Sequence, residues 1–183
     1  MKLFNFRHNT FKHGVHPPEH KDDTNRLPIR QFSFSPMLIL PMSQHLGAPS
    51  QPVVREGQEV FRGQLLAKAG GYMSVPLHAP VSGVVRKIAN VPTISGKMGQ
   101  GIYLEAFHYS TQEIAEGAPI DLETATPAEI LQGIQDAGIV GLGGAAFPTH
   151  VKLKIPDGKH CDTLIINGIE CEPYLTTDHR VML

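Results

Sequence analysis

Two glycine clusters decide how this sequence is interpreted, and the first of them strongly limits the local fold. It lies in two stretches, VREGQEVFRGQL at residues 54–65 and APVSGVV at residues 79–85. Glycine readily adopts the positive φ values that tight strand reversals need, so Gly57, Gly63 and Gly83 are each predicted to mark such a reversal. Short apolar runs bounded by turn-forming residues surround them, which predicts a small all-β module.

Four apolar runs are predicted to be strands of this module. The clearest is GIYLEAF at residues 101–107, because its alternation would place Ile102, Leu104 and Ala106 together on one face. The other three runs are residues 37–40, 65–67 and 84–88. We therefore predict an all-β domain over residues 32–108.

The order of these glycine motifs resembles the biotinyl/lipoyl-like barrel-sandwich hybrid over about residues 38–107. Carriers of that family present a lysine for acylation at the tip of the hairpin before the Ala-Pro strand. Here the hairpin reads GGYMSV at residues 70–75, the lysine position falls near Tyr72, and Lys68 lies on the far side of the Gly-Gly pair. We therefore expect a docking or spacer module and not a prosthetic-group carrier.

Residues 1–31 are polar, contain proline and are rich in histidine. His13, His16 and His20 are spaced three and four apart, which on a helix would place them on one face and allow a metal site. Pro17 and its neighbouring proline interrupt such a helix, so an N-terminal arm is the favoured interpretation and we predict no metal.

Charge and cysteine content exclude several classes of protein. Sixteen basic and 17 acidic residues leave a net charge of −1, which gives no electrostatic basis for binding nucleic acid. The two cysteines, Cys161 and Cys171, are too few for a disulfide framework or a four-cysteine cluster, and we expect buried thiols. The longest apolar run, residues 37–42, is too short to span a bilayer, and no signal peptide is evident, so a soluble chain is expected.

The pattern changes after a polar, acidic stretch at residues 109–125, which we predict to be a linker. Thr126-Pro127-Ala128-Glu129 forms a capping box with proline at the first helical position, and apolar residues at helical spacing follow it as far as Gly138. TLIIN at residues 163–167 predicts a buried strand, and a further helix is expected after Thr176. Residues 126–183 are therefore predicted to be the beginning of an α/β domain.

The second glycine cluster, GLGGAAFPT at residues 141–149, has two interpretations. Its small residues would let backbone amides approach a phosphate, Pro148 can begin a helix whose N-terminus favours anions, and Lys152 would add a positive charge. Phe147 offers an apolar face for a flat ring. The alternative is tight packing between a helix and a sheet. The loop matches neither a Walker motif nor the dinucleotide fingerprint.

The segment after the predicted strand favours the ligand interpretation. It reads NGIECEPY at residues 167–174. Ligands of open α/β sheets bind beyond the carboxyl ends of the strands. The Asn167 amide and the carboxylates of Glu170 and Glu172 are therefore candidates to hold a cofactor's hydroxyls and ring.

Together, GLGGAAFPTHVKL at residues 141–153 and LIINGIECEPYLTTDHRVM at residues 164–182 resemble a flavin-binding core shared by two families. One is the NADH-binding flavoprotein subunit of respiratory complex I, and the other is the C subunit of the Rnf (Rsx) electron-transport complex. Leu142, the sequence ECEPY at residues 170–174 and GVHPP at residues 14–18 favour the Rnf family, as does a lipoyl-like module ahead of the flavin domain.

The resemblance implies roles for matching residues, and it names no catalytic acid or base. Three departures matter: Ala146 and His150 replace usual glycines, and Ile169 stands where the complex I pattern is acidic. The implied FMN phosphate and ribityl contacts are Gly141, Gly143, Gly144 and Lys152, the flavin contacts are Asn167 and Glu170, Phe147 stacks on the nicotinamide or adenine side, and Glu172 binds NADH.

The resemblance also implies a function. The protein would pass electrons between NADH and ferredoxin through FMN and two 4Fe-4S clusters, which lie in a later cysteine-rich region absent from this chain. Its partners would be other Rnf subunits, including integral membrane ones, and it would sit peripherally on the cytoplasmic face of the bacterial inner membrane. The chain is expected to be an N-terminal fragment, inactive alone and binding FMN weakly or not at all. The alternatives are a complex I-type NADH dehydrogenase flavoprotein and a non-catalytic docking module.

Overall fold

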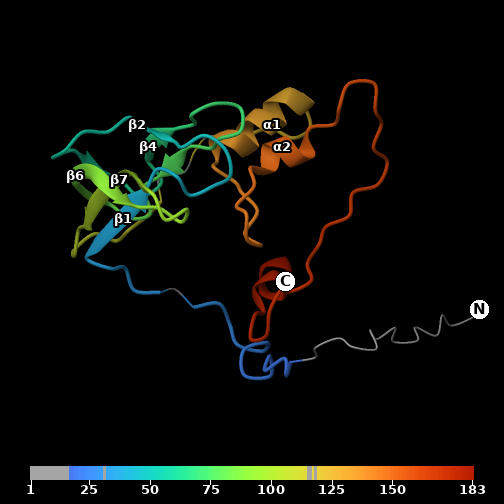
Figure 1. Ribbon diagram of the computed structural model, residues 1–183. Helices are drawn as coiled ribbons and strands as arrows, with labels where there is room; N and C mark the ends of the chain where they lie inside the picture. The colour runs from blue at the N-terminus through green and yellow to red at the C-terminus, as the bar shows by residue number, and fades with distance from the viewer. Residues whose placement is uncertain (1–16, 31, 115–116, 118) are drawn as a thin grey trace, which may run out of the picture. The chain divides into compact units, whose positions relative to one another are not determined.

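The computed structural model describes residues 17–30, 32–114, 117 and 119–183. Figure 1 shows the chain as a ribbon. It divides into two compact units. The larger is Phe32–Asp162, and the described residues of the smaller are 17–30 and Thr163–Leu183. Of the sequence-predicted histidine group, His13 and His16 lie outside the described residues.

Two antiparallel sheets form the first part of the larger unit. One has the strand order β1-β7-β6-β3 and the other β2-β4-β5. All four predicted strands are present, and β6 and β7 extend beyond the predicted runs. The strands are β1 (Met37–Pro41), β2 (Gln51–Pro52), β3 (Glu59–Val60), β4 (Leu65–Lys68), β5 (Leu77–His78), β6 (Gly83–Pro92) and β7 (Met98–Ala106).

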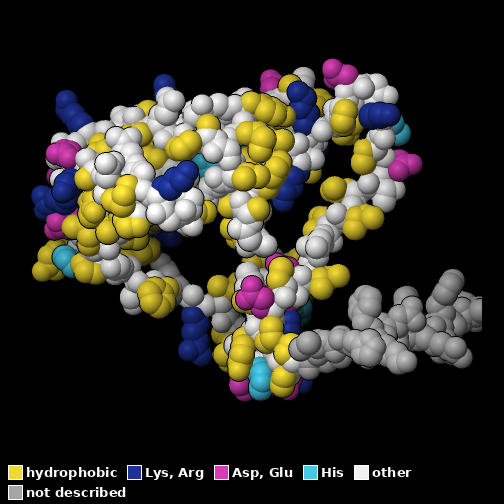
Figure 2. All heavy atoms as spheres, viewed as in Figure 1, with side chains coloured by type: hydrophobic (Ala, Val, Ile, Leu, Met, Phe, Trp, Pro, Cys, Tyr) yellow, Lys and Arg dark blue, Asp and Glu magenta, His cyan; other side chains and the backbone are white. Residues whose placement is uncertain are grey.

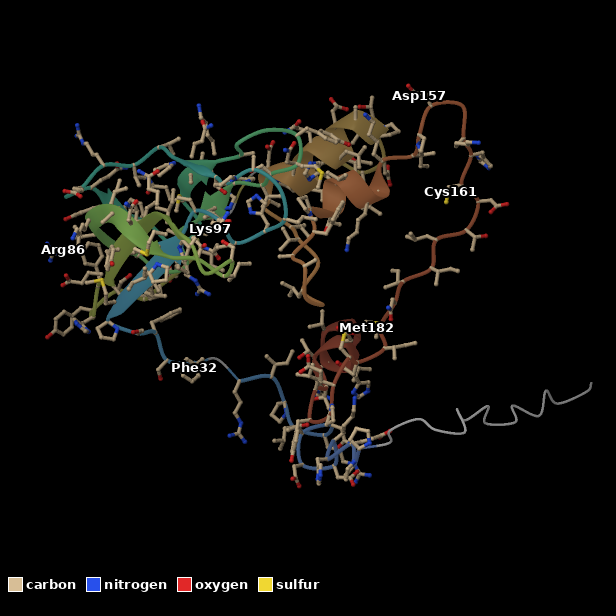
Figure 3. The ribbon with its side chains drawn as sticks, in the orientation of Figure 1. Phe32, Arg86, Lys97, Asp157, Cys161 and Met182 are labelled. Atoms are coloured by element: carbon tan, nitrogen blue, oxygen red, sulfur yellow. The ribbon has the colours of Figure 1, made fainter. Side chains whose placement is uncertain are left out.

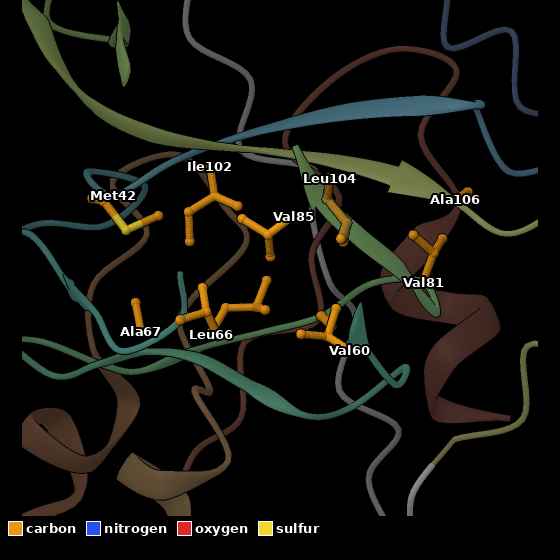
Figure 4. Packing of buried hydrophobic residues seen from close by; sticks show 11 residues of the cluster. Met42, Val60, Leu66, Ala67, Val81, Val85, Ile102, Leu104 and Ala106 are labelled. Carbon is orange, nitrogen blue, oxygen red and sulfur yellow. The ribbon is translucent and has the colours of Figure 1, made fainter. Parts of the chain in front are cut away.

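The core lies between these sheets (Figure 4). Ile102 and Leu104 are fully buried and Ala106 is nearly so, as the alternation predicts. From the second sheet Leu66 and Ala67 are also fully buried, and Figure 4 shows Leu66 facing Val85 and Ile102. Other members are Met42, Val54, Val60, Ala79 and Val81. Removal of this apolar surface from water stabilises the pairing of the sheets.

The glycines of the first cluster do not share one role. Gly57 and Gly63 have φ values of +79° and +88°, which confirms the predicted reversals. The prediction is wrong for Gly83, which begins β6 and pairs with Ala106 of β7 without a positive φ. A Cβ at position 83 would lie 2.0 Å from the carbonyl oxygen of Glu105, so close approach of two strands requires glycine there.

We expect Gly83→Ala to lower the free energy of unfolding by about 2 kcal/mol, because the backbone of β7 must move to admit the methyl group. Gly71→Ala is the matched control, since a Cβ at position 71 would meet nothing within 4 Å. Urea unfolding of both variants measures the difference. Equal stability of the two variants would contradict the packing described for Gly83.

The second part of the larger unit holds two helices, α1 (Pro127–Asp136) and α2 (Thr149–Leu153), which lie side by side in Figure 1. The predicted capping box is present at α1: the Thr126 amide donates to Glu129 Oε2 (2.8 Å), and the Glu129 amide donates to Thr126 Oγ1 (3.3 Å). Hydrogen bonds from Thr126 lower the pKa of the Glu129 carboxyl. Gly138 follows the helix at φ +74°, as expected for its stop signal.

The described part of the smaller unit joins residues 17–30 to the end of the chain. The Tyr174 amide donates to the Glu19 carbonyl (2.8 Å), and the Tyr174 ring stacks on His20 with centroids 4.9 Å apart. The helix expected after Thr176 is α3 (Thr177–Met182). Among the described helices, none is long and apolar enough to cross a membrane.

Two expectations for the segment after α2 are wrong in the structure. Residues 163–167 form no strand, and Ile165 is 86% exposed. A buried strand needs neighbouring strands and side chains that cover it. In the part of the chain that the structure describes, all strands belong to the two sheets of the larger unit. Cys161 and Cys171 are exposed and not buried, because both lie on irregular segments; Figure 3 shows this for Cys161.

Candidate functional site

The second glycine cluster forms a closed loop in the larger unit. Val140 pairs with Pro148 in an isolated antiparallel bridge. The Gly141 amide donates to the Phe147 carbonyl (2.9 Å), and the Thr149 amide donates to the Ile139 carbonyl (3.0 Å). We call residues 141–147 the glycine loop. Residues 142–145 form a turn within the loop and are exposed, and among the described residues none outside the loop accepts a hydrogen bond from its amides from Leu142 onward, so an acceptor from outside can approach them.

Lys152 lies over one end of this loop. A Cβ at position 141 would lie 2.7 Å from Lys152 Nζ, so the glycine provides the space that the ammonium group occupies. The same Nζ is 5.8 Å from the centroid of the Phe147 ring. Gly144 has φ +130°, a conformation that side-chain-bearing residues rarely adopt, and Gly143 is exposed. The structure therefore brings together five sequence-predicted site residues: Gly141, Gly143, Gly144, Phe147 and Lys152.

The helix contributes less than the sequence suggests. Pro148 precedes α2 and does not occupy its first turn, and α2 has only five residues. A helix this short supplies little dipole, so anion binding here depends on the loop amides and the Lys152 charge.

The remaining three predicted residues belong to the smaller unit. Asn167 Oδ1 accepts a hydrogen bond from the Ile169 amide (3.0 Å), and Glu170 Oε1 accepts one from the His179 amide in the first turn of α3 (3.1 Å). Both carboxylates, Glu170 and Glu172, line a hollow of about 300 Å³ within this unit. Its other lining residues are Pro17, Glu19, Lys21, Cys171 and Pro173. The N-terminal arm thus contributes to the surroundings of the two carboxylates.

Sequence reasoning missed the residues that attach the glycine loop to the sheets. His150 is 3% exposed, and its Nε2 lies 2.8 Å from the carbonyl oxygen of Tyr72. Ala146 has φ +48°, and its carbonyl accepts a hydrogen bond from the Leu46 amide (3.2 Å). The only sign of these contacts in the sequence was that both residues replace usual glycines. A side chain at either position changes the contacts that the loop makes.

A second buried histidine lies beside residues 74–75, which follow Tyr72 closely in the sequence. His45 is 6% exposed, and its Nε2 is 3.1 Å from Ser74 Oγ, 3.1 Å from the Ala48 carbonyl oxygen and 3.3 Å from the Val75 amide nitrogen. Burial lowers the pKa of this imidazole, and the hydrogen bond with Ala48 opposes the shift in part.

Because the folded state disfavours the charged His45, its contribution to stability is present above a pH of about 6.5 and lost as the pH falls. We therefore expect the wild-type unfolding free energy to decline more steeply between neutral pH and pH 5 than that of His45→Asn. His78, whose pKa burial also lowers, remains in both proteins and cancels. Urea titrations across this pH range measure the two slopes, and parallel curves would contradict the expectation.

Comparison with known proteins assigns both parts of the chain. Residues 9–107 match the RnfC barrel sandwich hybrid domain, and residues 134–183 match the Nuo51 FMN-binding domain. The second match contains the glycine loop and the segment with Asn167, Glu170 and Glu172.

Three curated relatives are similar over nearly all of the chain. The C subunit of a Na(+)-translocating ferredoxin:NAD(+) oxidoreductase complex from Acetobacterium woodii is 44% identical over 97% of this chain and 40% of its own length. The C subunit of a proton-translocating ferredoxin:NAD(+) oxidoreductase complex from Clostridium ljungdahlii is 42% identical over 95% of this chain and 38% of its own. The C subunit of an ion-translocating oxidoreductase complex from Haemophilus influenzae is 41% identical over 94% of this chain and 26% of its own length.

The chain therefore spans at most about two fifths of the length of these relatives. The resemblance inferred from the sequence motifs is confirmed, including the barrel-sandwich module and the FMN-binding region. The match of the barrel domain covers more than half of the 183 residues. The chain belongs to the RnfC family and corresponds to the N-terminal region of the C subunit of the Rnf complex.

Proposed function

We propose that this chain supplies part of the FMN site in the RnfC protein of an ion-translocating complex that passes electrons between NADH and ferredoxin. The observation that carries the proposal is the glycine loop, with its available amides and Lys152 at one end, inside a region that matches an FMN-binding domain. The barrel match at residues 9–107 favours the Rnf complex over a complex I-type flavoprotein.

The residues present fit a phosphate group. A phosphate needs several donors on one side and space for close approach to the backbone. The loop offers exposed amides that donate to no described residue outside it, and apart from Gly144 and its two chain neighbours no described atom lies within 4 Å of where a Gly144 Cβ would be. Lys152 is exposed at the same loop and adds a positive charge.

Under this proposal each predicted residue keeps the role that the family implies. Gly141, Gly143, Gly144 and Lys152 hold the phosphate and ribityl chain, and Phe147 presents its ring to the nicotinamide or adenine. In the smaller unit, Asn167 and Glu170 contact the flavin and Glu172 binds NADH. When bound, FMN would supply the chemistry of hydride acceptance from NADH and of single-electron transfer, and this chain would orient the group and limit access of water.

The wider assignment is part of the same proposal. The names of the relatives include ferredoxin, NAD(+) and ion translocation, so we infer ferredoxin and the other Rnf subunits, integral membrane ones among them, as partners. We place the protein peripherally at the cytoplasmic face of the membrane, with two 4Fe-4S clusters held elsewhere in the full-length protein. The domain division proposed for it is an arm (1–31), a barrel (32–108), a linker (109–125) and an α/β flavin domain beginning at residue 126.

Lys152→Ala in the full-length protein is expected to weaken FMN binding about 30-fold, since a charged hydrogen bond to phosphate contributes about 2 kcal/mol. Lys68→Ala is the control, because Lys68 is an exposed lysine on β4, outside the glycine loop. Quenching of flavin fluorescence gives both dissociation constants. If the two variants bind FMN equally well, Lys152 has no phosphate role; if the wild type does not bind FMN, the docking-module alternative gains support.

A further inference from the structure

The connection between β4 and β5, residues 69–76, is held firmly by the barrel beneath it. The Ala48 amide donates to the Met73 carbonyl (2.9 Å), and Ser50 Oγ donates to the Val75 carbonyl (2.8 Å). Ser74 is fully buried, and its Oγ accepts a hydrogen bond from the Gly70 amide (2.8 Å). This is the hairpin that in carrier domains would bear the acylated lysine. Here hydrogen bonds with the barrel fix the conformation of the connection, so it is suited to support a neighbouring segment of the chain.

Three backbone carbonyls of this connection face α1 and α2. The Tyr72 carbonyl is 2.8 Å from His150 Nε2, and because a carbonyl only accepts, that nitrogen carries the proton. Gln135 Nε2 donates to the Ser74 carbonyl (3.0 Å) and lies 3.4 Å from the Gly71 carbonyl. The His150 ring also meets the Tyr72 ring edge-on, with centroids 5.6 Å apart. The contacts therefore join the connection to the helices on both sides of the glycine loop.

The glycine loop itself is held in an unfavourable conformation. Ala146 has φ +48°, which alanine rarely adopts unless its surroundings impose it. The Leu46 amide of the barrel donates to the Ala146 carbonyl (3.2 Å), and Pro148, two residues later, is fully buried. The barrel thus contacts the loop directly at Ala146 and, through His150, holds the helix α2 that follows the loop and carries Lys152.

We propose that the barrel is a rigid support for the glycine loop, and that His150 is the positioning residue through which residues 69–76 set the loop and Lys152 for a phosphate group. The support of the loop stands on the contacts alone, and its use for FMN phosphate rests on the proposed function. An ordinary packing role would place an apolar side chain at position 150. A buried donor aimed at a carbonyl of a fixed hairpin instead specifies one position of α2.

The test compares His150→Leu with His150→Gln in the full-length protein. Glutamine can carry an N–H donor to nearly the place of the imidazole Nε2, whereas leucine leaves the Tyr72 carbonyl without its donor. Hydrogen exchange reports on the loop through the Gly141 and Thr149 amides, which close it. Dissociation constants for FMN and for riboflavin, which lacks the phosphate, report on the site.

In His150→Leu we expect the Gly141 and Thr149 amides to exchange at least about tenfold faster while the β6–β7 amides keep their rates. We expect FMN affinity to fall about tenfold with riboflavin affinity unchanged, and His150→Gln to restore both measurements most of the way. If the Gly141 and Thr149 amides of His150→Leu exchange at the same rates as in the wild type, the support role is overturned. Faster exchange with unaltered FMN affinity would overturn the positioning role. A wild type that binds FMN no better than riboflavin would overturn the proposed function while leaving the exchange result to decide the support role.

Discussion

Leu66→Ala is expected to lower the free energy of unfolding by about 3 kcal/mol, because the cavity left by a fully buried leucine is only partly closed by its neighbours. Leu66 lies on β4 and has no exposed surface. Figure 4 shows its side chain between Val60 and Ala67, facing the strands of the other sheet. The two sheets share this one cluster, so the loss acts on the whole barrel.

The neighbouring residue supplies the control for that experiment. Leu65 lies on the same strand but is 40% exposed, so Leu65→Ala removes much less buried surface and should change stability by less than about 1 kcal/mol. Urea unfolding followed by circular dichroism measures both variants. A loss for Leu65→Ala as large as that for Leu66→Ala would contradict the placement of the core.

Gly144→Val is expected to weaken FMN binding at least about 100-fold in the full-length protein. Gly144 has φ +130°, and a β-branched residue cannot hold that conformation without strain. The loop would relax to another path, which would displace its amides. Flavin fluorescence titration provides the affinity, and the unfolding free energy of the same variant shows whether the barrel is intact.

Leu142→Val is the matched control for this loop substitution. Leu142 is 89% exposed and has no positive φ, so valine is accommodated there. FMN affinity within about threefold of the wild type is expected, since exposed substitutions without a special backbone conformation have small effects. If Gly144→Val binds as well as Leu142→Val does, the loop conformation is not what FMN requires.

The barrel was predictable because its signals are local. Alternation in residues 101–107 placed Ile102 and Leu104 in the core, and the capping box at Thr126 located the start of α1. The reason predicted for the glycine at position 83 was wrong. A close approach between two strands depends on the partner strand, so the residues next to Gly83 in the sequence do not indicate it. Figure 2 shows both basic and acidic side chains on the visible face of the larger unit, which agrees with the near-zero net charge.

Other features depend on contacts far apart in the sequence. Residues 163–167 have the composition of a buried strand, but composition cannot supply the neighbouring strands that burial needs. Gln112 lies in the predicted linker, yet it is buried: the Ser82 amide donates to its Oε1 (2.6 Å). His150 and Ala146 were recognised only as departures from a family pattern. Their contacts with Tyr72 and Leu46 appear once the hairpin and the loop are folded together.

The proposed function depends on the claim that the glycine loop and Lys152 bind the phosphate of FMN. The most direct measurement compares FMN with riboflavin, in the full-length wild type and in Lys152→Ala. We expect the substitution to weaken FMN binding about 30-fold and to leave riboflavin binding unchanged, since only FMN carries the charge that Lys152 meets. An equal loss of affinity for both ligands, or no loss for either, would contradict the claim.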